Sequence, residues 1–265
     1  DGRRVEVRAR AVILACGALL TPALLLKNGL ANHSGQVGRN LSVHPATSVS
    51  AVFDRPIRGY NHVPQGHGVD QFHREGMLML GASAPLDMGS TLFPFVGQRF
   101  VEAMESYDKV ASFGVMVEDG PNGRIVLGPG RRPITLYHLG TRERRLLARG
   151  SAAVARIFRA AGARTCYTEI QSHAVLESDA DVDALERATP PAHDMTMVGF
   201  HPLGSCRMGK SASSSVVDTS YESHDVPGLY LVDGSVVPTS IAVNPQLTIM
   251  ALATRAGEII GKRLG

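Results

Sequence analysis

The stretch GFHPLGSCRMG, residues 199–209, places a histidine, a cysteine and an arginine in a loop punctuated by glycines. His201 and Cys206 could serve as metal ligands or in a thiol enzyme, and the histidine alone could act as a base beside a cofactor. A structural zinc site needs four ligands, and the chain contains neither a CxxC nor an HxxxH pair. A reactive Cys206 would need an activating base or a helix N-terminus, so a small buried residue is the preferred interpretation. We therefore predict no metal site and take His201 as a candidate general base, because the ordinary pKa of imidazole lies near operating pH.

The composition indicates a globular chain without a strong charge bias. Its 265 residues are 44% hydrophobic and carry a net charge of +3, which is enough apolar material for one large domain or two small ones. That charge makes no case for a nucleic-acid partner. Three cysteines without framework spacing favour a reducing compartment, and we predict a cytoplasmic location. The apolar run at residues 11–26 is shorter than the roughly 20 residues that span a bilayer, so no transmembrane segment is predicted.

The first 30 residues predict a strand followed by a helix. RVEVRAR, residues 4–10, alternates apolar and charged side chains as a half-exposed strand does, and it leads into VILA, which is typical of a strand buried on both faces. In the helix that follows, we expect Thr21 as N-cap, Pro22 as first helical residue and Gly29 just past the end.

The middle of the chain predicts an antiparallel sheet and one long helix. Residues 119–123, DGPNG, have the composition of a hairpin loop. Apolar residues at helical spacing predict a helix over residues 141–161, closed by Gly162. Short strands are expected at residues 48–53, 77–80, 111–118, 124–127 and 134–137.

The last third of the chain predicts a buried strand, a loop and a long helix. LYLVDGS, residues 229–235, is an apolar strand that ends at Asp233 and Gly234. Asn244 has the residue type of a helix N-cap and Pro245 that of a first helical residue, and the apolar spacing continues to about Lys262.

Three separated blocks of the sequence resemble the glucose-methanol-choline (GMC) flavin oxidoreductases. They are ILACGALLTPALLLKNGL followed by VGRNLSVHP, HPLGSCRMG followed by VVD, and GLYLVDGSVVPTSIAVNPQLTIMALATRAGEII. Three motifs in the expected order are far more specific than any one of them. Their spelling is most similar to the long-chain alcohol oxidase and dehydrogenase branch. The resemblance implies an α+β chain, with an α/β FAD-binding part and an antiparallel-sheet substrate domain.

The resemblance also implies roles for particular residues. His201 matches the family's active-site histidine, which takes the hydroxyl proton of an alcohol while hydride passes to the flavin. Asn244 matches a second active-site position, which would hydrogen-bond the substrate oxygen. The implied cofactor is FAD. Contacts with FAD are implied for Asn40, Asp233, Gly234, Pro245 and Gln246.

Each of these residues also has a structural interpretation. Asn244 could be only a helix cap, Asp233 and Gly234 only a turn that ends a strand, and His44 only a histidine before a proline. The low-charge stretch at residues 77–97 suits an apolar substrate and equally suits an ordinary core.

One motif of the family is missing. No GxGxxG turn, the usual anchor of the FAD diphosphate, occurs in the sequence. We therefore predict the C-terminal portion of a GMC enzyme, which opens inside a sheet and whose partner would be a missing N-terminal FAD-binding half. The expected segments are 1–47 and 196–265 for the FAD-binding part and 48–195 for the substrate domain. The predicted function is FAD-dependent oxidation of a small-molecule alcohol, with long-chain or otherwise apolar alcohols as candidates; the alternative is a non-catalytic remnant without cofactor.

Overall fold

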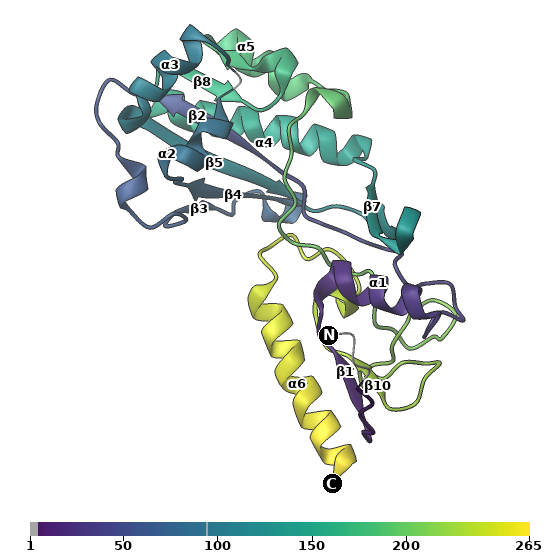
Figure 1. The fold of residues 1–265 in the computed structure, drawn as a ribbon. Helices are drawn as coiled ribbons and strands as arrows, with labels where there is room; N and C mark the ends of the chain where they lie inside the picture. Colours follow the sequence, from purple (N-terminus) through teal and green to yellow (C-terminus); the bar gives the residue numbers. More distant parts are fainter. Residues whose placement is uncertain (1–4, 94) are drawn as a thin grey trace. The chain divides into compact units, whose positions relative to one another are not determined.

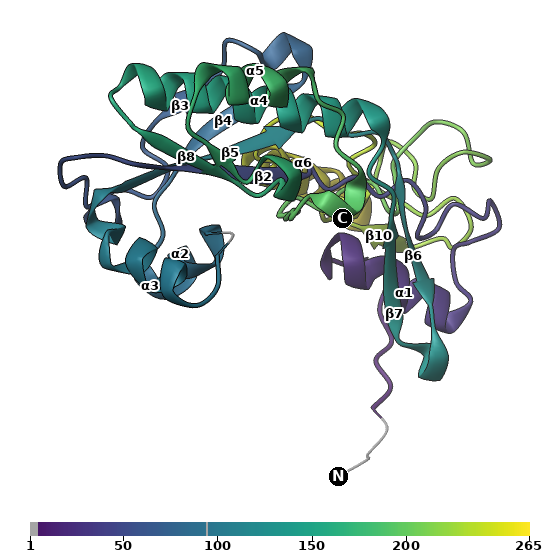
Figure 2. The ribbon, with the colours of Figure 1, turned by 90° about the horizontal axis from the view of Figure 1, so that it is seen from above.

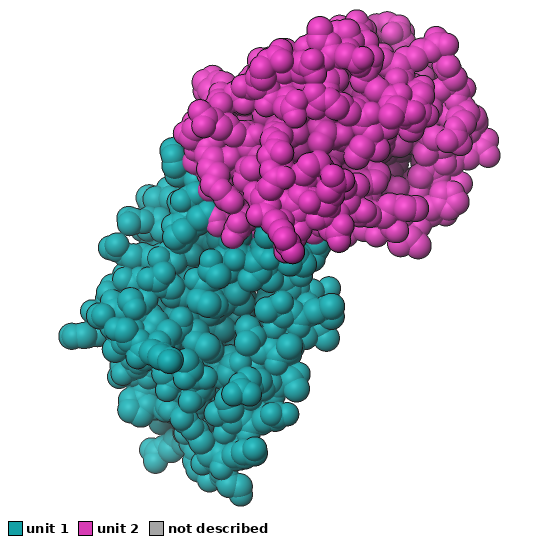
Figure 3. All heavy atoms as spheres, turned by 180° about the vertical axis from the view of Figure 1, so that it is seen from behind, with its two compact units in different colours: residues 1–43, 120–138, 201–265 teal, residues 44–119, 139–200 magenta. Residues whose placement is uncertain are grey.

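The computed structural model describes residues 5–93 and 95–265, and the chain divides into two compact units (Figure 3). Unit 1 contains residues 1–43, 120–138 and 201–265, and unit 2 contains residues 44–119 and 139–200. Residues 120–138 thus group with the two ends of the chain, whereas the expected segment 48–195 included them. Helices, parallel strands and antiparallel strands are all present, which confirms the predicted α+β class.

Unit 2 is built on a six-stranded antiparallel sheet in the order β3-β4-β5-β2-β8-β9 (Figure 1). The central strand β2 aligns Val49 with Phe113 of β5 and with Thr168 of β8. The strands of this sheet are β2 (Ala46–Val52), β3 (Gly68–Val69), β4 (Met77–Ala82), β5 (Val110–Val117), β8 (Thr165–Thr168) and β9 (Val175–Leu176).

The long helix of unit 2 lies across one face of this sheet (Figure 2). It is α4, Thr141–Ala160, which confirms the helix predicted over residues 141–161, and the chain leaves it through Gly162 at φ 98°. A side chain at Gly150 would collide with Val115 of β5, so this glycine lets helix and sheet approach closely. The other helices are α2 (Leu86–Gly89), α3 (Gln98–Glu105) and α5 (Asp179–Arg187), with 3-10 turns at Gly59–Asn61, His73–Glu75, Ser90–Leu92, Tyr107–Lys109, Gln171–His173 and Ala192–Asp194.

Unit 1 combines a two-stranded parallel sheet, a hairpin and two long helices. Strand β1 aligns Val12 with Leu229 of β10, and the core beside them includes Leu25, Cys206 and Tyr221. The helices and strands are β1 (Val12–Leu14), α1 (Gly17–Asn28), β6 (Gly123–Leu127), β7 (Pro133–Tyr137), β10 (Leu229–Leu231) and α6 (Gln246–Leu264), with 3-10 turns at Pro129–Arg131 and Gly234–Val236. Among the described residues, no helix has the length and apolar character needed to cross a membrane.

Helix α1 begins four residues before the expected N-cap. It starts at Gly17, so Thr21 and Pro22 lie inside it, while Gly29 ends it in the left-handed conformation as predicted. A proline inside a helix leaves the carbonyl four residues earlier without its usual donor. Here that carbonyl, on Ala18, accepts a hydrogen bond from Ser205 Oγ at 2.5 Å. This contact from a distant segment explains why the local signal at Pro22 was misleading.

The opening strand is shorter and more exposed than predicted. Residues 5–10 form no strand, and Arg4 lies outside the described residues. Val12 and Ile13 are 51% and 53% exposed, so the expectation of a strand buried on both faces is wrong. Within the described part of the chain, β1 pairs only with β10, and this sheet of two strands leaves those side chains uncovered.

The predicted hairpin at residues 119–123 is also wrong. Strand β5 pairs with β2 and β4 in unit 2, whereas β6 pairs with β7 in unit 1, so this loop joins two different sheets. Its first residue, Asp119, is buried and accepts the backbone N–H of His44 at 3.2 Å. This hydrogen bond joins residues that are far apart in the sequence, and it keeps the loop from forming a hairpin.

Candidate functional site

The three sequence motifs of unit 1 are hydrogen-bonded side by side. On one edge of the segment 201–208, Ser42 and Leu203 exchange backbone hydrogen bonds of 3.1 and 2.9 Å, and His201 N donates to Val43 O at 3.3 Å. On the other edge, Gly204 N donates to Gly234 O at 3.2 Å and Cys206 N to Ser235 O at 2.9 Å. The loop therefore lies between the VGRNLSVHP segment and the turn that follows β10.

Two glycines lie where these segments meet, and Gly204 is the one whose position excludes a side chain. Gly204 has φ +81°, and a Cβ there would lie 2.5 Å from Asn40 O. A Cβ at Gly234 would lie 3.2 Å from both Pro202 O and Ile249 Cδ1 of α6. Gly234 thus marks the place where the histidine segment and the first turns of α6 converge, and close packing alone accounts for glycine at that position.

Asp233 fixes the turn after β10 to the start of α1. Its Oδ2 accepts hydrogen bonds from Gly17 N at 3.0 Å and from Thr21 Oγ1 at 2.6 Å, and its Oδ1 accepts one from Ser235 N at 2.7 Å. A carboxylate at a helix N-terminus satisfies an otherwise unbonded N–H group and interacts favourably with the helix dipole. Asp233 therefore has a structural role, and it holds the backbone against which the 201–208 segment is bonded.

His201 is half-buried at the first position of that segment. Burial lowers the pKa of its imidazole below the ordinary value near 6.5, because desolvation disfavours the charged form. The side chain is consequently neutral at pH 7, which is the state that a proton acceptor requires.

Asn244 and its neighbours are arranged differently from the prediction. Helix α6 begins at Gln246, so Pro245 is its N-cap instead of its first residue, and no side chain caps the helix. The expectation of Asn244 as N-cap is therefore wrong. The Asn244 side chain is exposed, and in the described part of the chain it makes no hydrogen bond. Of the two residues that follow, Pro245 is buried and Gln246 is exposed.

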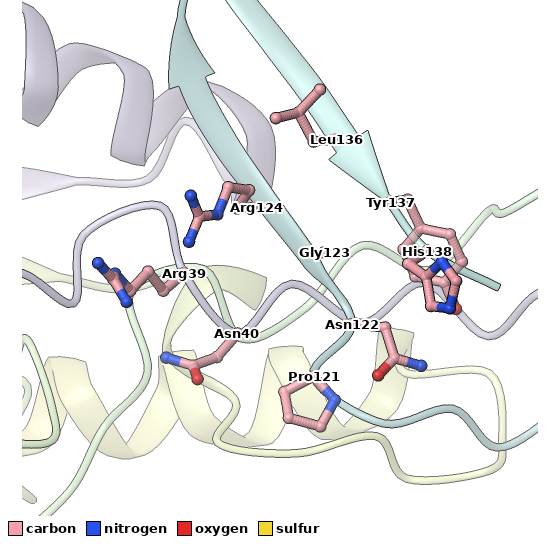
Figure 4. A pocket seen from close by; sticks show the side chains of 9 residues that line it. All are labelled: Arg39, Asn40, Pro121, Asn122, Gly123, Arg124, Leu136, Tyr137 and His138. Carbon is pink, nitrogen blue, oxygen red and sulfur yellow. The ribbon is translucent and has the colours of Figure 1, made fainter. Parts of the chain in front are cut away.

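Asn40 lies on the edge of a cavity. It adopts the left-handed conformation at φ 63°, and its Nδ2 donates to Gln36 Oε1 at 3.0 Å. The cavity is formed in unit 1 by the segment around Asn40 and both strands of the β6-β7 hairpin (Figure 4). Sequence reasoning missed this cavity, because nothing in the local pattern indicated that Arg39 and Arg124 would line it together.

Cys206 is a buried residue of the core, as the sequence favoured. Burial raises the pKa of its thiol to about 12 and that of Cys166 to about 11. Both thiols are therefore protonated at neutral pH, and a protonated thiol is a poor nucleophile.

We expect one of the three thiols to react with a disulfide reagent while the protein is folded. Cys16 is exposed, whereas Cys166 and Cys206 are buried. Titration with 5,5′-dithiobis(2-nitrobenzoic acid) at mildly alkaline pH should release one equivalent of thiolate per chain, and denaturant should release the rest. Rapid labelling of the peptide that contains Cys206 in the folded chain would contradict the buried, protonated thiol.

The exposed histidines of unit 2 do not form a metal centre in the described residues. Across residues 5–93 and 95–265, no group of three or more His, Cys, Asp or Glu side chains is placed to hold a metal ion. His62, His67 and His73 are exposed. His62 and His67 also border a mostly apolar cavity of about 490 Å³ inside unit 2, beside Phe113.

Two family models match this chain, and both are described as GMC oxidoreductase. One matches residues 1–46 and the other matches residues 130–253. The chain belongs to the GMC oxidoreductases. The cofactor of this family is FAD, as the motif resemblance implied.

Curated GMC relatives are two to three times as long as this chain. An uncharacterized GMC-type oxidoreductase of Mycobacterium tuberculosis is 33% identical over 100% of this chain and 42% of its own length. A long-chain-alcohol oxidase of Arabidopsis thaliana is 29% identical over 95% of this chain and 36% of its own. A 2-methyl-1,2-propanediol dehydrogenase of Mycolicibacterium austroafricanum is 30% identical over 99% of this chain and 50% of its own. The chain thus spans half or less of each of them.

Solved structures show the same fold at low identity. The crystal structure of pyridoxine 4-oxidase from Mesorbium loti matches with a TM-score of 0.67 and 20% identity, over 94% of this chain and 50% of that one. A formate oxidase structure from Aspergillus oryzae, solved in a study of FAD modification, matches with a TM-score of 0.65 and 16% identity, over 96% of this chain and 54% of that one. The fold is therefore that of the GMC flavoenzymes.

Proposed function

We propose that this chain is the C-terminal portion of an FAD-dependent oxidoreductase that oxidises an alcohol to an aldehyde or ketone. His201 would be the general base and Asn244 the second polar group at the substrate oxygen. The observation that best supports this proposal is the bonded arrangement of the three motifs around Gly234, together with the lowered pKa of His201 at the start of the central motif.

The residues around the start of α6 fit the ring of a flavin. The first turn of α6 has no side-chain cap, and Gln246, Leu247 and Thr248 are exposed there. Uncapped N–H groups carry the positive end of the helix dipole, which stabilises negative charge. A reduced flavin is anionic at its pyrimidine end, so the backbone N–H of Gln246 would hold that end, with Asn40, Asp233, Gly234 and Pro245 as further contacts.

The proposed chemistry divides the work between the cofactor and the protein. When bound, FAD supplies the hydride acceptor for the carbon-bound hydrogen of the alcohol. His201 takes the hydroxyl proton, so that the substrate loses a proton and a hydride and becomes a carbonyl. Asn244 donates its amide N–H to the substrate oxygen and fixes its position relative to the imidazole. Because His201 is neutral at pH 7, its imidazole can accept the hydroxyl proton of the alcohol without first losing a proton of its own.

The anchor of the FAD diphosphate is proposed to lie on a strand–turn–helix segment that this sequence does not contain. The sequence has no GxGxxG turn, and the described part of unit 1 exposes large apolar side chains on β1, α1, β7 and α6. Such faces usually pack against another part of a protein. These exposed apolar residues are Val12 and Ile13 of β1, Leu19, Leu20 and Leu24 of α1, Ile134 and Leu136 of β7, and Leu247 and Met250 of α6.

The proposed substrate is an alcohol with an apolar carbon skeleton. The names of the relatives, which include long-chain-alcohol oxidases and a propanediol dehydrogenase, support this class. A cytoplasmic location remains a prediction from the cysteine content.

The test is flavin binding followed by reduction with an alcohol. The purified chain is incubated with FAD and dialysed. This is done with the chain alone, and with the chain co-expressed with the part of the Mycobacterium tuberculosis relative that it does not cover. We expect a retained flavin band with the added part, and anaerobic bleaching of that band by an aliphatic alcohol. A folded complex with no flavin band would favour the non-catalytic remnant, whereas a band without bleaching by any alcohol would refute the alcohol class.

A further inference from the structure

The cavity beside Asn40 brings cationic side chains together within unit 1. Its volume is about 490 Å³. No carboxylate is among its lining residues. Its polar lining is made by Arg39, Asn40, Asn122, Arg124, Tyr137 and His138 (Figure 4).

The two arginines are neighbours because residues 38–41 pair with strand β6. Leu41 and Gly123 exchange backbone hydrogen bonds of 3.0 and 2.8 Å, and Ile125 N donates to Gly38 O at 2.6 Å. Residues on paired antiparallel segments lie within reach of one another's side chains. The backbones at Arg39 and Arg124 are therefore on paired segments, and both side chains line the same cavity.

Neither guanidinium is neutralised by a carboxylate of residues 5–93 or 95–265. In the part of the chain that the structure describes, the side chains of Arg39 and Arg124 form no hydrogen bond and no ion pair. By contrast, Arg156 of unit 2 lies 2.6 Å from Asp183 and 2.8 Å from Glu186. Like charges on neighbouring strands repel each other, so an anion bound between these two exposed arginines would reduce their repulsion.

The same two arginines also border an apolar groove. This second cavity, of about 400 Å³, is lined by Leu26, Val37 and Leu127 in addition to Arg39 and Arg124. The pair thus stands between a polar cavity and an apolar one. Arginine suits such a place, because its planar guanidinium binds carboxylate and phosphate in a bidentate manner and is weakly hydrated.

We propose that Arg39 and Arg124 form a binding site for a carboxylate or phosphate group in this cavity, separate from the substrate contacts proposed for His201 and Asn244. The anion would lie in the polar cavity between the guanidinium groups. It is either a small free anion or the head group of an alkyl-chain anion whose chain occupies the apolar groove.

Calorimetric titration of the whole 265-residue chain at low ionic strength tests this site. The probes are inorganic phosphate and monomeric octyl phosphate, which share a head group. We expect binding of both to the unmodified chain and binding at least about tenfold weaker to the R39Q/R124Q variant, a change that corresponds to about 1.4 kcal/mol. The matched control is R132Q, which removes an exposed arginine of the same hairpin that lines neither cavity. Far-UV circular dichroism establishes that each variant is folded.

The outcomes separate the two sources of the anion. Tighter binding of octyl phosphate, with the gain removed by L127N, identifies an alkyl-chain anion, and equal affinity for the two probes identifies a small free anion. The proposal is overturned if the unmodified chain binds neither probe, if R39Q/R124Q binds as the unmodified chain does, or if R132Q weakens binding equally. The readout needs no flavin, so failure here leaves the proposed oxidoreductase function untouched.

Discussion

Replacing His201 with alanine is expected to slow flavin reduction by an alcohol by about 100-fold or more, because general base catalysis contributes about 10²–10⁴-fold. Loss of the imidazole removes the acceptor of the hydroxyl proton, while the backbone bond from His201 N to Val43 O can remain. The measurement is anaerobic stopped-flow reduction of the flavin-loaded enzyme. Flavin content should change little, which separates loss of the base from loss of the cofactor.

The pH dependence gives a second readout for the same residue. Desolvation lowers the pKa of His201, so the imidazole accepts a proton only when the pH falls below the ordinary histidine value near 6.5. The reduction rate should therefore stay constant above that value and fall as the pH drops through the lowered pKa. H201A should lose this acid limb. Because the folded state binds fewer protons than the unfolded state, His201 also contributes stability above pH 6.5 that is lost as the pH falls through its folded pKa.

The matched control is His33→Ala, which removes an exposed histidine of the same unit. It should leave both the rate and the acid limb unchanged. An H201A enzyme that retains the unmodified rate, or an acid limb that persists in that variant, would exclude His201 as the base.

The sequence predicted those elements whose local signals agree with their tertiary contacts. The helical periodicity of α4 and α6 and the apolar triplet of β10 were sufficient, because packing and propensity favour the same state there. The predictions were wrong where a contact with a residue far away in the sequence determines the local conformation. Ser205 donates a hydrogen bond to the carbonyl of Ala18, which Pro22 leaves without its usual donor. The hydrogen bond from His44 N to Asp119 keeps residues 119–123 from forming a hairpin.

The candidate site was also only partly predictable from the sequence. His201 and Asn244 could be found because their motifs resemble a family, and the structure adds that the motif segments are bonded together around Gly234. Their chemical roles remain predictions. The cavity of Arg39 and Arg124 could not be found, because it depends on the pairing of residues 38–41 with a strand more than 80 positions away.

Replacing Asp233 with alanine is expected to lower the free energy of unfolding by about 3 kcal/mol, since hydrogen bonds to a charged group contribute about 1.5–3 kcal/mol each and Asp233 is partly exposed to water. The variant leaves Gly17 N, Thr21 Oγ1 and Ser235 N without their acceptor. Urea unfolding followed by circular dichroism measures the change, with an unaltered dependence on denaturant if the native state stays compact.

Two further variants separate the bonds of Asp233 from its charge. D233N keeps one acceptor oxygen and should lose less stability than D233A, and Thr21→Val removes one donor while the carboxylate stays. If D233A unfolds at the same urea concentration as the unmodified chain, the Asp233 contacts do not stabilise unit 1. Loss of the Asp233 hydrogen bonds is also expected to disturb the candidate site, because Gly234 O and Ser235 O accept hydrogen bonds from the N–H groups of Gly204 and Cys206. A D233A protein should therefore hold flavin more weakly even where it remains folded, since the turn at residues 233–236 positions the segment that begins with His201.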